Sequence, residues 1–184
     1  MDSIKLMMEE HQFILRMLTV MRMACYRLMQ QDTIDYDDFD QMIDFISNYA
    51  DAHHHGKEEK LLFNEVVTHG GTAGNKLITH GMLVEHDLGR LHIRELREAL
   101  QSYRGGDDMS RLDIIANAIG YAQLLRRHID KEDSVIYPFA RKCLPKDIMD
   151  KVNQETVDFE KAALDSNTKN HYEQLVASIE NKYV

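Results

Sequence analysis

The spacing of apolar residues limits the folds open to this chain more than any other feature of its sequence. Along four long segments these residues recur at alternating steps of three and four, which places them on one face of an α-helix. We expect these helices to run from about Ser3 to Gln31, from the acidic run 35–38 to Gly70–Gly71, from about Asn75 to Arg104, and from about Asp108 to Pro138, which would kink or end the last one. The pattern predicts an all-α protein built on an up-down-up-down four-helix bundle.

Each predicted helix has one face that should point into the bundle, and every one of these faces mixes apolar residues with histidine or glutamate. In chain order the four faces carry Ile4, Met7, His11, Ile14, Leu18, Met21, Cys25 and Leu28; Phe39, Ile43, Ile46, Ala50, His54, Glu58 and Leu61; Met82, His86, Gly89, Ile93, Leu96, Leu100 and Tyr103; and Ile114, Ala118, Tyr121, Leu125, His128, Glu132, Val135 and Phe139.

The length and composition of the chain agree with a helical domain. With 184 residues, of which 43% are hydrophobic, the chain can form one domain with a substantial core. Two prolines and nine glycines are few, which favours long helices over a β protein with many turns. We expect a single domain over 1–184, with the bundle at about 3–142 and an extension at about 145–184 that forms one or two shorter helices.

Charge and patterning exclude several classes of function. The formal net charge of −9 argues against a nucleic-acid partner, because phosphate contacts need a basic surface. No apolar run approaches the roughly 20 residues that span a bilayer, and the N-terminal residues lack the pattern of a secretory signal. Cys25 and Cys143 form no spacing motif, so we interpret them as reduced thiols in a cytoplasmic protein.

One histidine- and glutamate-containing motif occurs twice. Two segments share the pattern His-x-x-Lys-Glu-acid-x-x followed by two apolar residues: HHGKEEKLLF, which starts at His54, and HIDKEDSVIYP, which starts at His128. This pairs Glu58 with Glu132 at an offset of 74 residues. His11 and His86 each follow a glutamate and are 75 residues apart. The two offsets indicate a duplicated helical hairpin.

The duplicated motif should bring six metal-type side chains together inside the bundle. Residues four positions apart share a helix face, so His54 points the same way as Glu58. Burying two carboxylates without partners is costly, whereas a pair of metal ions would compensate them. Imidazole and carboxylate donors suit iron, manganese or zinc. We therefore predict a dinuclear metal site with the ligands His11, His54, Glu58, His86, His128 and Glu132.

The neighbouring polar residues have plainer interpretations. We expect His53 to face solvent. His55 is ambiguous: it neighbours His54 and could reach the edge of the ligand cluster, but a position behind the ligands or on the surface is favoured. Glu59 and Asp133 are either surface charges or hydrogen-bond partners of ligand histidines. The remaining histidines fall off the inward faces or near helix ends, and we interpret them as surface residues: His69, His80, His92 and His171.

The ordered ligand set resembles the hemerythrin-like family, whose signature places His, His-x-x-x-Glu, His and His-x-x-x-Glu on four helices. The resemblance covers roughly residues 3 to 142. It implies a non-heme di-iron centre that is bridged by Glu58, Glu132 and an oxo or hydroxo group. It also implies a protein that binds or senses O2, NO or peroxide, or that handles iron.

One position departs from the oxygen-carrying members of this family, and the carboxylate on the fourth helix has two candidates. Those proteins have His-x-x-x-His on the third helix, whereas Arg90 follows His86 here, which argues against reversible oxygen carriage. They also use His-x-x-x-x-Asp on the fourth helix, so Asp133 competes with the preferred Glu132. Gly89 and Arg90 should leave an open metal position beside a small space. The chain begins directly with the first helix, which argues against a role in iron–sulfur repair.

Two other functions fit the same residues. The first is a di-iron oxidoreductase that acts on peroxide, and the second is a structural or interaction bundle that holds zinc or no metal. The sequence does not decide whether the protein is an enzyme.

Overall fold

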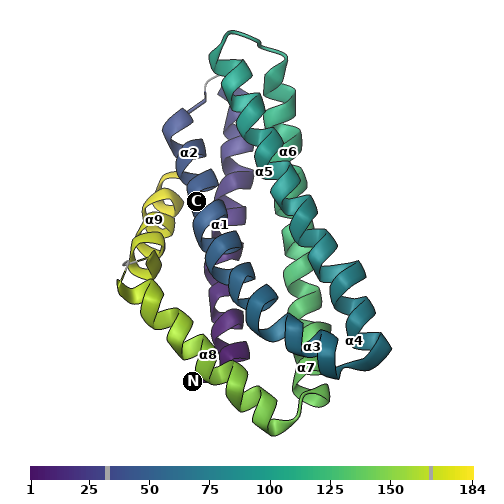
Figure 1. The fold of residues 1–184 in the computed structure, drawn as a ribbon. Coiled ribbons are helices and arrows are strands. Elements are labelled where there is room, and N and C mark those ends of the chain that lie inside the picture. Colours follow the sequence, from purple (N-terminus) through teal and green to yellow (C-terminus); the bar gives the residue numbers. More distant parts are fainter. Residues whose placement is uncertain (32–33, 166–167) are drawn as a thin grey trace.

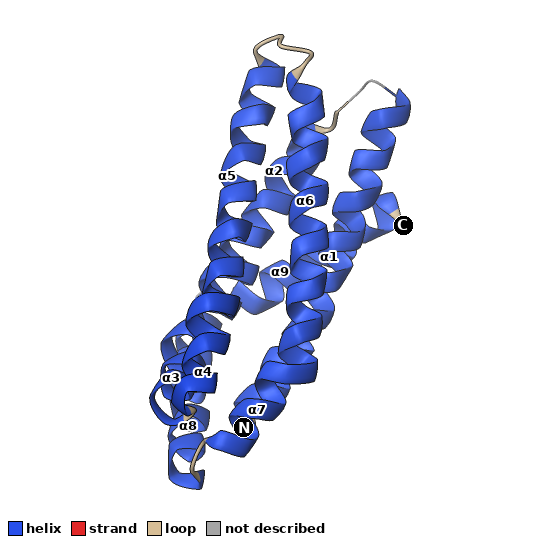
Figure 2. Cartoon of the chain, turned by 90° about the vertical axis from the view of Figure 1, so that its right-hand side faces the viewer, coloured by secondary structure: helices blue, strands red, loops and turns tan. Residues whose placement is uncertain are grey.

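The structure, a computed structural model, describes residues 1–31, 34–165 and 168–184, which form helices with no strand among them (Figures 1 and 2). Four helical rods come first. They consist of α1 (Ser3–Gln31); α2 (Tyr36–Phe45), η1 (Ile46–His55), η2 (Glu58–Phe63) and α3 (Asn64–His69); α4 (Gly71–Leu77), η3 (Ile78–Met82) and α5 (Leu83–Arg104); and α6 (Ser110–Lys131), η4 (Glu132–Ile136) and α7 (Tyr137–Cys143). Two further helices follow, α8 (Lys146–Asp165) and α9 (Thr168–Tyr183). The all-α prediction is confirmed.

Local signals explain where the rods begin and end. Asp35 caps α2 by accepting a hydrogen bond from the backbone N–H of Asp38 at 3.2 Å. Gly71 has a φ of +61°, which allows the tight turn between α3 and α4. The third rod therefore starts at this glycine, a few residues earlier than predicted. Pro138 does not end the fourth rod, which continues to Cys143 directly after the π-helical turn η4.

In the described part of the chain, four π-helical segments, η1 to η4, interrupt the second, third and fourth rods. A π turn holds an extra residue, so it changes which side chains face inward beyond it. The predicted inward positions Leu61 and Val135 are respectively half-buried and 47% exposed, whereas Leu62 and Ile136 are buried. Phe139 is likewise only half-buried. The predicted inward faces are correct up to Glu58 and Glu132 and shift by one residue after them.

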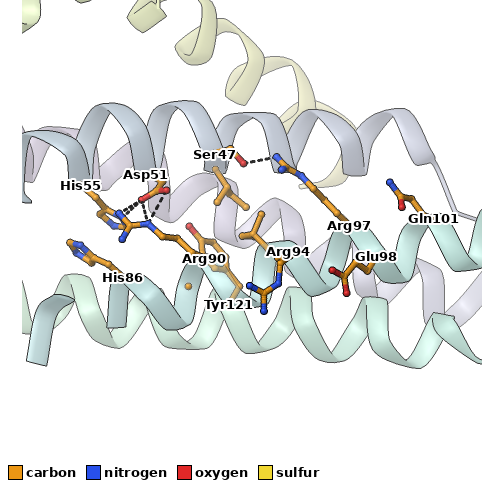
Figure 3. A pocket seen from close by; sticks show the side chains of 13 residues that line it. Ser47, Asp51, His55, His86, Arg90, Arg94, Arg97, Glu98, Gln101 and Tyr121 are labelled. Atoms are coloured by element: carbon orange, nitrogen blue, oxygen red, sulfur yellow. Dashed lines mark hydrogen bonds and ion pairs between the residues drawn. The ribbon is translucent and has the colours of Figure 1, made fainter. Parts of the chain in front are cut away.

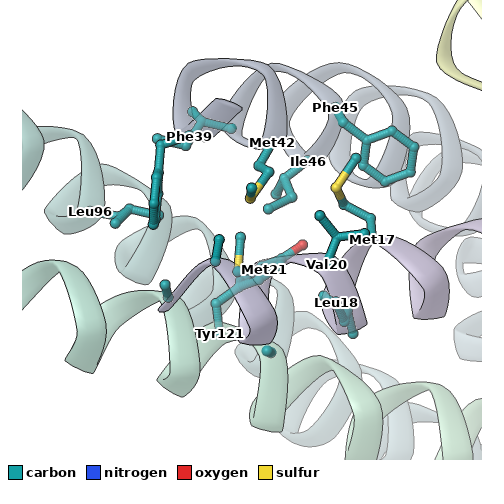
Figure 4. Close-up of a cluster of buried hydrophobic side chains, with 14 of the residues drawn as sticks. Met17, Leu18, Val20, Met21, Phe39, Met42, Phe45, Ile46, Leu96 and Tyr121 are labelled. Atoms are coloured by element: carbon teal, nitrogen blue, oxygen red, sulfur yellow. The ribbon is translucent and has the colours of Figure 1, made fainter. Parts of the chain in front are cut away.

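The apolar core is divided into two clusters with a polar layer between them. The larger cluster includes Met17, Met21, Phe39 and Tyr121 and fills one end of the rods (Figure 4). The smaller includes Met7 and fills the other end, with Leu62, Phe63, Met82, Ile136 and Tyr137. Along α1, His11 falls between Met7 of one cluster and Ile14 of the other. The predicted ligands thus occupy the boundary between two apolar regions.

The helices α8 and α9 lie along one flank of the rods (Figure 1). Asn153 of α8 accepts hydrogen bonds from the backbone N–H and the hydroxyl of Ser3 at the start of α1. On α9, Tyr172 donates to Asp44 at 2.9 Å, and Glu180 pairs with Arg16. These contacts fasten the C-terminal helices to the first two rods. No helix among the described residues is both long enough and apolar enough to cross a membrane.

Candidate metal centre

The structure brings all six predicted ligands together. Each of them is at most 1% exposed, and they come from all four rods: His11, His54, Glu58, His86, His128 and Glu132. The Nε2 atoms of His11 and His54 are 2.9 Å apart, and those of His86 and His128 are 3.0 Å apart. Each hairpin therefore contributes one pair of imidazoles whose Nε2 atoms converge.

The donor atoms form two groups that could each hold a metal ion. The first group contains Glu58, His11, His54 and Glu132. The second group contains Glu58, His55, His86 and His128. Within each group the donor atoms lie within 4.8 Å of one another. Glu58 belongs to both groups. Its Oε2 atom lies 3.7 Å from Nε2 of His54 and 3.7 Å from Nε2 of His86. This carboxylate is therefore placed to contact two ions at once.

Glu132 also reaches both histidine pairs. Its Oε1 lies 3.0 Å from Nε2 of His128, and its Oε2 lies 3.3 Å from Nε2 of His11. Asp133 points elsewhere: its side chain is 29% exposed and it pairs with Nδ1 of His11 at 2.8 Å. Of the two candidate carboxylates on this rod, Glu132 is the one inside the layer.

A carboxylate holds the Nδ1 atom of every histidine in the two groups. The pairs are His11–Asp133 at 2.8 Å, His54–Glu10 at 2.8 Å, His55–Asp51 at 3.3 Å, His86–Glu59 at 2.7 Å and His128–Glu85 at 3.0 Å. Such a partner fixes the ring so that Nδ1 carries the proton and Nε2 is free to bind a metal. The interpretation of Glu59 and Asp133 as hydrogen-bond partners of ligand histidines agrees with this geometry.

These carboxylates repeat the internal symmetry of the chain. Within each hairpin, the glutamate before the first histidine holds the second histidine: Glu10 holds His54, and Glu85 holds His128. Between hairpins, the acidic residue after each buried glutamate holds the first histidine of the other hairpin. The duplication therefore includes the residues that orient the imidazoles as well as the imidazoles themselves.

His55 is the residue whose role the sequence left open. It is 4% exposed, and its ring stacks on that of His86 with 3.9 Å between centroids and 10° between planes. A surface position for His55 is excluded by its burial, and its donor atoms lie with the group around His86 and His128. The run of three histidines was the available signal. An ideal α-helical pattern assigns only one of three consecutive residues to the inward face, whereas this run ends the π-helical segment η1.

His53 is buried as well, contrary to the prediction that it faces solvent. It is 5% exposed and its Nε2 lies 3.2 Å from carboxylate oxygens of both Glu10 and Glu160. The fully buried ammonium of Lys57 contacts the same two carboxylates, at 2.5 Å from Glu160. Glu10, His53 and Glu160 have the donor types of a third cation site. Lys57 already supplies a positive charge there, so this cluster is an ion-pair network.

The other histidines lie away from the centre. His69, His80 and His171 are exposed, as predicted. His92 is half-buried instead of exposed, with its Nδ1 atom 3.0 Å from Oδ1 of Asn117.

The two buried glutamates lack sufficient polar partners. Among the described residues, neither oxygen of Glu132 nor Oε2 of Glu58 has a hydrogen-bond partner. Burial, together with repulsion from Glu132, raises the pKa of Glu58 to about 8. Uncompensated buried carboxylates cost several kcal/mol. Cations placed between the imidazoles and these oxygens would remove that cost, so the donor set fits metal ions.

Tyr137 and Phe63 occupy equivalent positions in the two copies of the motif and distinguish the two groups. Tyr137 donates a hydrogen bond from its hydroxyl to Oε1 of Glu58 at 2.7 Å, and its ring stacks on His11. Phe63 stacks on His86 and has no hydroxyl. The group with two histidines therefore has a phenol beside it, and the group with three histidines has a purely apolar ring.

A groove runs from the three-histidine group along α5 (Figure 3). Its volume is about 360 Å³, and its lining includes His55, His86 and Gly89. The predicted space beside Gly89 is thus present. The predicted shortage of ligands on this side is not present, because His55 adds an imidazole there. Arg90, which stands where oxygen carriers have histidine, instead pairs with Asp51 and Glu59 at 2.7 Å each.

The comparison with known families agrees with this centre. A family model described as the hemerythrin HHE cation binding domain matches residues 2–140. No curated protein and no solved structure matches the chain. The matched residues include both histidine groups and all the carboxylates that hold them, whereas α8 and α9 lie beyond the match. The chain belongs to the hemerythrin HHE cation-binding family.

Proposed function

We propose that the protein holds a non-heme dinuclear iron centre. Its ligands are His11, His54, Glu58, His86, His128 and Glu132, with His55 as a fifth imidazole, and an oxo or hydroxo group completes the bridge. The observation that carries this proposal is the set of unpartnered carboxylate oxygens of Glu58 and Glu132, which lie among five imidazoles whose Nδ1 atoms are held by carboxylates. Both glutamates reach donors of the two histidine groups, which supports two ions rather than one.

We propose that the centre binds or senses O2, NO or peroxide. Iron would supply redox chemistry and a Lewis acid. The group of His11 and His54 has one imidazole fewer than the other group, so an added ligand fits best there. Tyr137 lies on that side, with its hydroxyl 3.4 Å from Nε2 of His11. Because the proton of this phenol goes to Glu58, its oxygen can accept a hydrogen bond from a protonated ligand such as peroxide, and its ring covers one face of the group.

A peroxide-consuming oxidoreductase is the second candidate. The groove beside His55 and His86 supports it, because an enzyme needs room for a substrate next to its metals. Turnover of peroxide with an added reductant would distinguish this activity from simple binding.

We also propose an up-down-up-down topology, a single domain and a cytoplasmic location. The order of the four rods in Figure 1 supports an up-down-up-down bundle, and the contacts of α8 and α9 with α1 and α2 support one domain over 1–184. The two free cysteines, Cys25 and Cys143, are compatible with a cytoplasmic protein.

Anaerobic reconstitution with ferrous iron tests the proposal. Elemental analysis should give about two iron ions per chain, as expected for two metal-binding groups. Exposure to air, azide or NO should then change the visible spectrum. About one ion per chain would refute the dinuclear centre. A chain that prefers zinc and stays colourless would refute the redox function, because zinc is d10.

A further inference from the structure

The groove beside the three-histidine group is built like a small-molecule site. It lies between η1 and α5, with Tyr121 of α6 also in its lining (Figure 3). On α5 its lining extends from His86 to Gln101, which is roughly 22 Å at 1.5 Å per residue. Its volume of about 360 Å³ lies within the range of ligand pockets. The groove therefore suits an extended molecule rather than a diatomic gas.

The inner surface of the groove is mainly apolar. Ile46 and Ile93 are at most 6% exposed, and the ring of Tyr121 is 2% exposed. Gly89 leaves the groove open beside this ring, since a Cβ atom at that position would lie 3.4 Å from Cε2 of Tyr121. A ligand that contacts these residues gains by removing apolar surface from water.

The outer part of the groove carries an excess of arginine. Three arginines line it against two carboxylates, although the chain as a whole has a net charge of −9. Arg90 is occupied by Asp51 and Glu59. Arg97 donates to the neutral hydroxyl of Ser47 at 2.7 Å. In the described part of the chain, no carboxylate lies within ion-pair distance of Arg94 or Arg97. These two guanidinium groups are therefore available to an anion.

We propose that this groove binds an organic anion with an extended apolar body, such as a medium-chain carboxylate. Its carboxylate pairs with Arg94 and Arg97, since guanidinium matches carboxylate geometry. Its body lies over Ile93 and Tyr121 toward Gly89 and the metal centre. Binding at this site does not depend on metal, so it is an addition to the proposed iron chemistry.

Calorimetric titration of decanoate into metal-free and iron-loaded protein tests the proposal. We expect one decanoate per chain in both forms, weaker binding of butyrate, and no comparable binding of decyltrimethylammonium, which has the opposite charge. Equal binding of butyrate would overturn the role of the apolar surface. Equal binding of the cation would overturn the charge argument. Failure to bind decanoate would refute the groove alone, whereas failure to retain iron would refute the metal centre alone.

Two sets of variants locate the binding. The double variant Arg94→Gln/Arg97→Gln should weaken decanoate binding about tenfold or more, because hydrogen bonds to charged groups are lost. The control Arg22→Gln removes an exposed arginine from a separate apolar hollow that includes Met23 and Ile119, and it should leave decanoate binding unchanged. Gly89→Leu should fill the end of the groove and also weaken binding. Retained affinity in both groove variants, or an equal loss in the Arg22 variant, would place the ligand elsewhere.

Discussion

The two hairpins supply nearly identical donor sets but differ in how they are covered. In the first, Glu10 holds His54 and contacts Lys57, which is fully buried beneath Glu160 of α8. In the second, Glu85 holds His128 and contacts Lys131, whose side chain is 43% exposed. The chemistry of the pairs is the same. The burial of the lysine differs, because helix α8 packs over the first hairpin.

This difference separates the roles of the two hairpins. The first hairpin is enclosed, and its group has two histidines with Tyr137 beside it. The second is joined by His55 from the first hairpin and opens toward a groove. Although the two motifs are nearly symmetric in sequence, the centre they form is asymmetric. The two-histidine group is enclosed, whereas the three-histidine group opens toward the groove.

Substitution of the buried glutamates should have the largest effect on metal content, because both carboxylates reach both histidine groups. Glu58→Ala and Glu132→Ala should each lower iron content from about two ions to one or none, since each removes a donor from both ions. Elemental analysis after reconstitution measures this. His171→Ala, a change at an exposed histidine, should retain the full content. If a glutamate variant kept both ions, that carboxylate would not be a bridge.

The lysines should give the second largest effect. Lys57→Met leaves Glu10 and Glu160 buried without their ammonium and should lower the free energy of unfolding by about 3–5 kcal/mol. Lys131→Met should lower it by less than about 1 kcal/mol, because that pair is partly solvated. Urea unfolding of the metal-free proteins measures both values.

A second variant tests whether the stability lost in Lys57→Met comes from the unpaired carboxylates. Adding Glu160→Gln to Lys57→Met removes one stranded carboxylate and should restore part of the lost stability. Equal effects of the two lysine substitutions would mean that α8 does not distinguish the hairpins.

His55 gives a smaller and more local effect. The duplication pairs it with Ile129, so His55→Ile makes the two hairpins alike at this position. The variant should bind one of two iron ions about tenfold to a hundredfold more weakly, as is typical when support around a metal is lost. Titration with a chelator that competes for iron measures the two affinities separately. Identical titration curves for the variant and the parent would exclude His55 from the ligand set.

Arg90 should have the mildest effect on iron and provides the control for this side of the centre. Arg90→Gln leaves Asp51 and Glu59 in place but removes their shared partner. We expect a few-fold loss of affinity at the three-histidine group, because the two carboxylates orient His55 and His86 less firmly. The same chelator titration measures this loss. A larger loss than in His55→Ile would mean that the guanidinium supports more of the centre than these two rings.

The metal-free protein should show a dependence on pH that metal suppresses. Burial raises the pKa of Glu58 to about 8. Despite the opposing effect of burial, the hydrogen bond to Asp133 and the nearby carboxylates of Glu132 and Glu58 raise the pKa of His11 to about 9. A raised pKa in the folded state means that the folded protein binds more protons than the unfolded chain. Stability from Glu58 is therefore complete below its ordinary value of 4.5 and is lost as the pH rises through about 8.

Urea unfolding of metal-free protein between pH 6 and 9 should accordingly show a falling midpoint. Glu58→Gln, which cannot ionise, should flatten this fall. A midpoint that rises over this range would contradict the raised pKa of Glu58.

Much of the centre could be predicted from sequence because it depends on spacing within single helices. His54 and Glu58, or His128 and Glu132, lie four residues apart, and α-helical geometry is sufficient to align them. The position of His55 could not be predicted in this way, since it depends on the π-helical segment η1. The same is true of Leu62 and Ile136, which replace Leu61 and Val135 in the core after π turns.

The burial of Lys57 was not predictable for a different reason. Its partner Glu160 lies 103 residues further along the chain, and no local pattern links the two residues. The sequence predicted a helix in that region but not the surface that this helix would cover.

The contact between Lys57 and Glu160 has a consequence for the order of events during synthesis. Helix α8 leaves the ribosome after all four rods, so the ammonium of Lys57 acquires its second carboxylate only after the rods have been synthesised. Until then, the side of the bundle that contains His54 remains uncovered while the side that contains His128 already has all its local partners. A nascent chain that meets iron early would therefore receive it before helix α8 has packed over this side of the bundle.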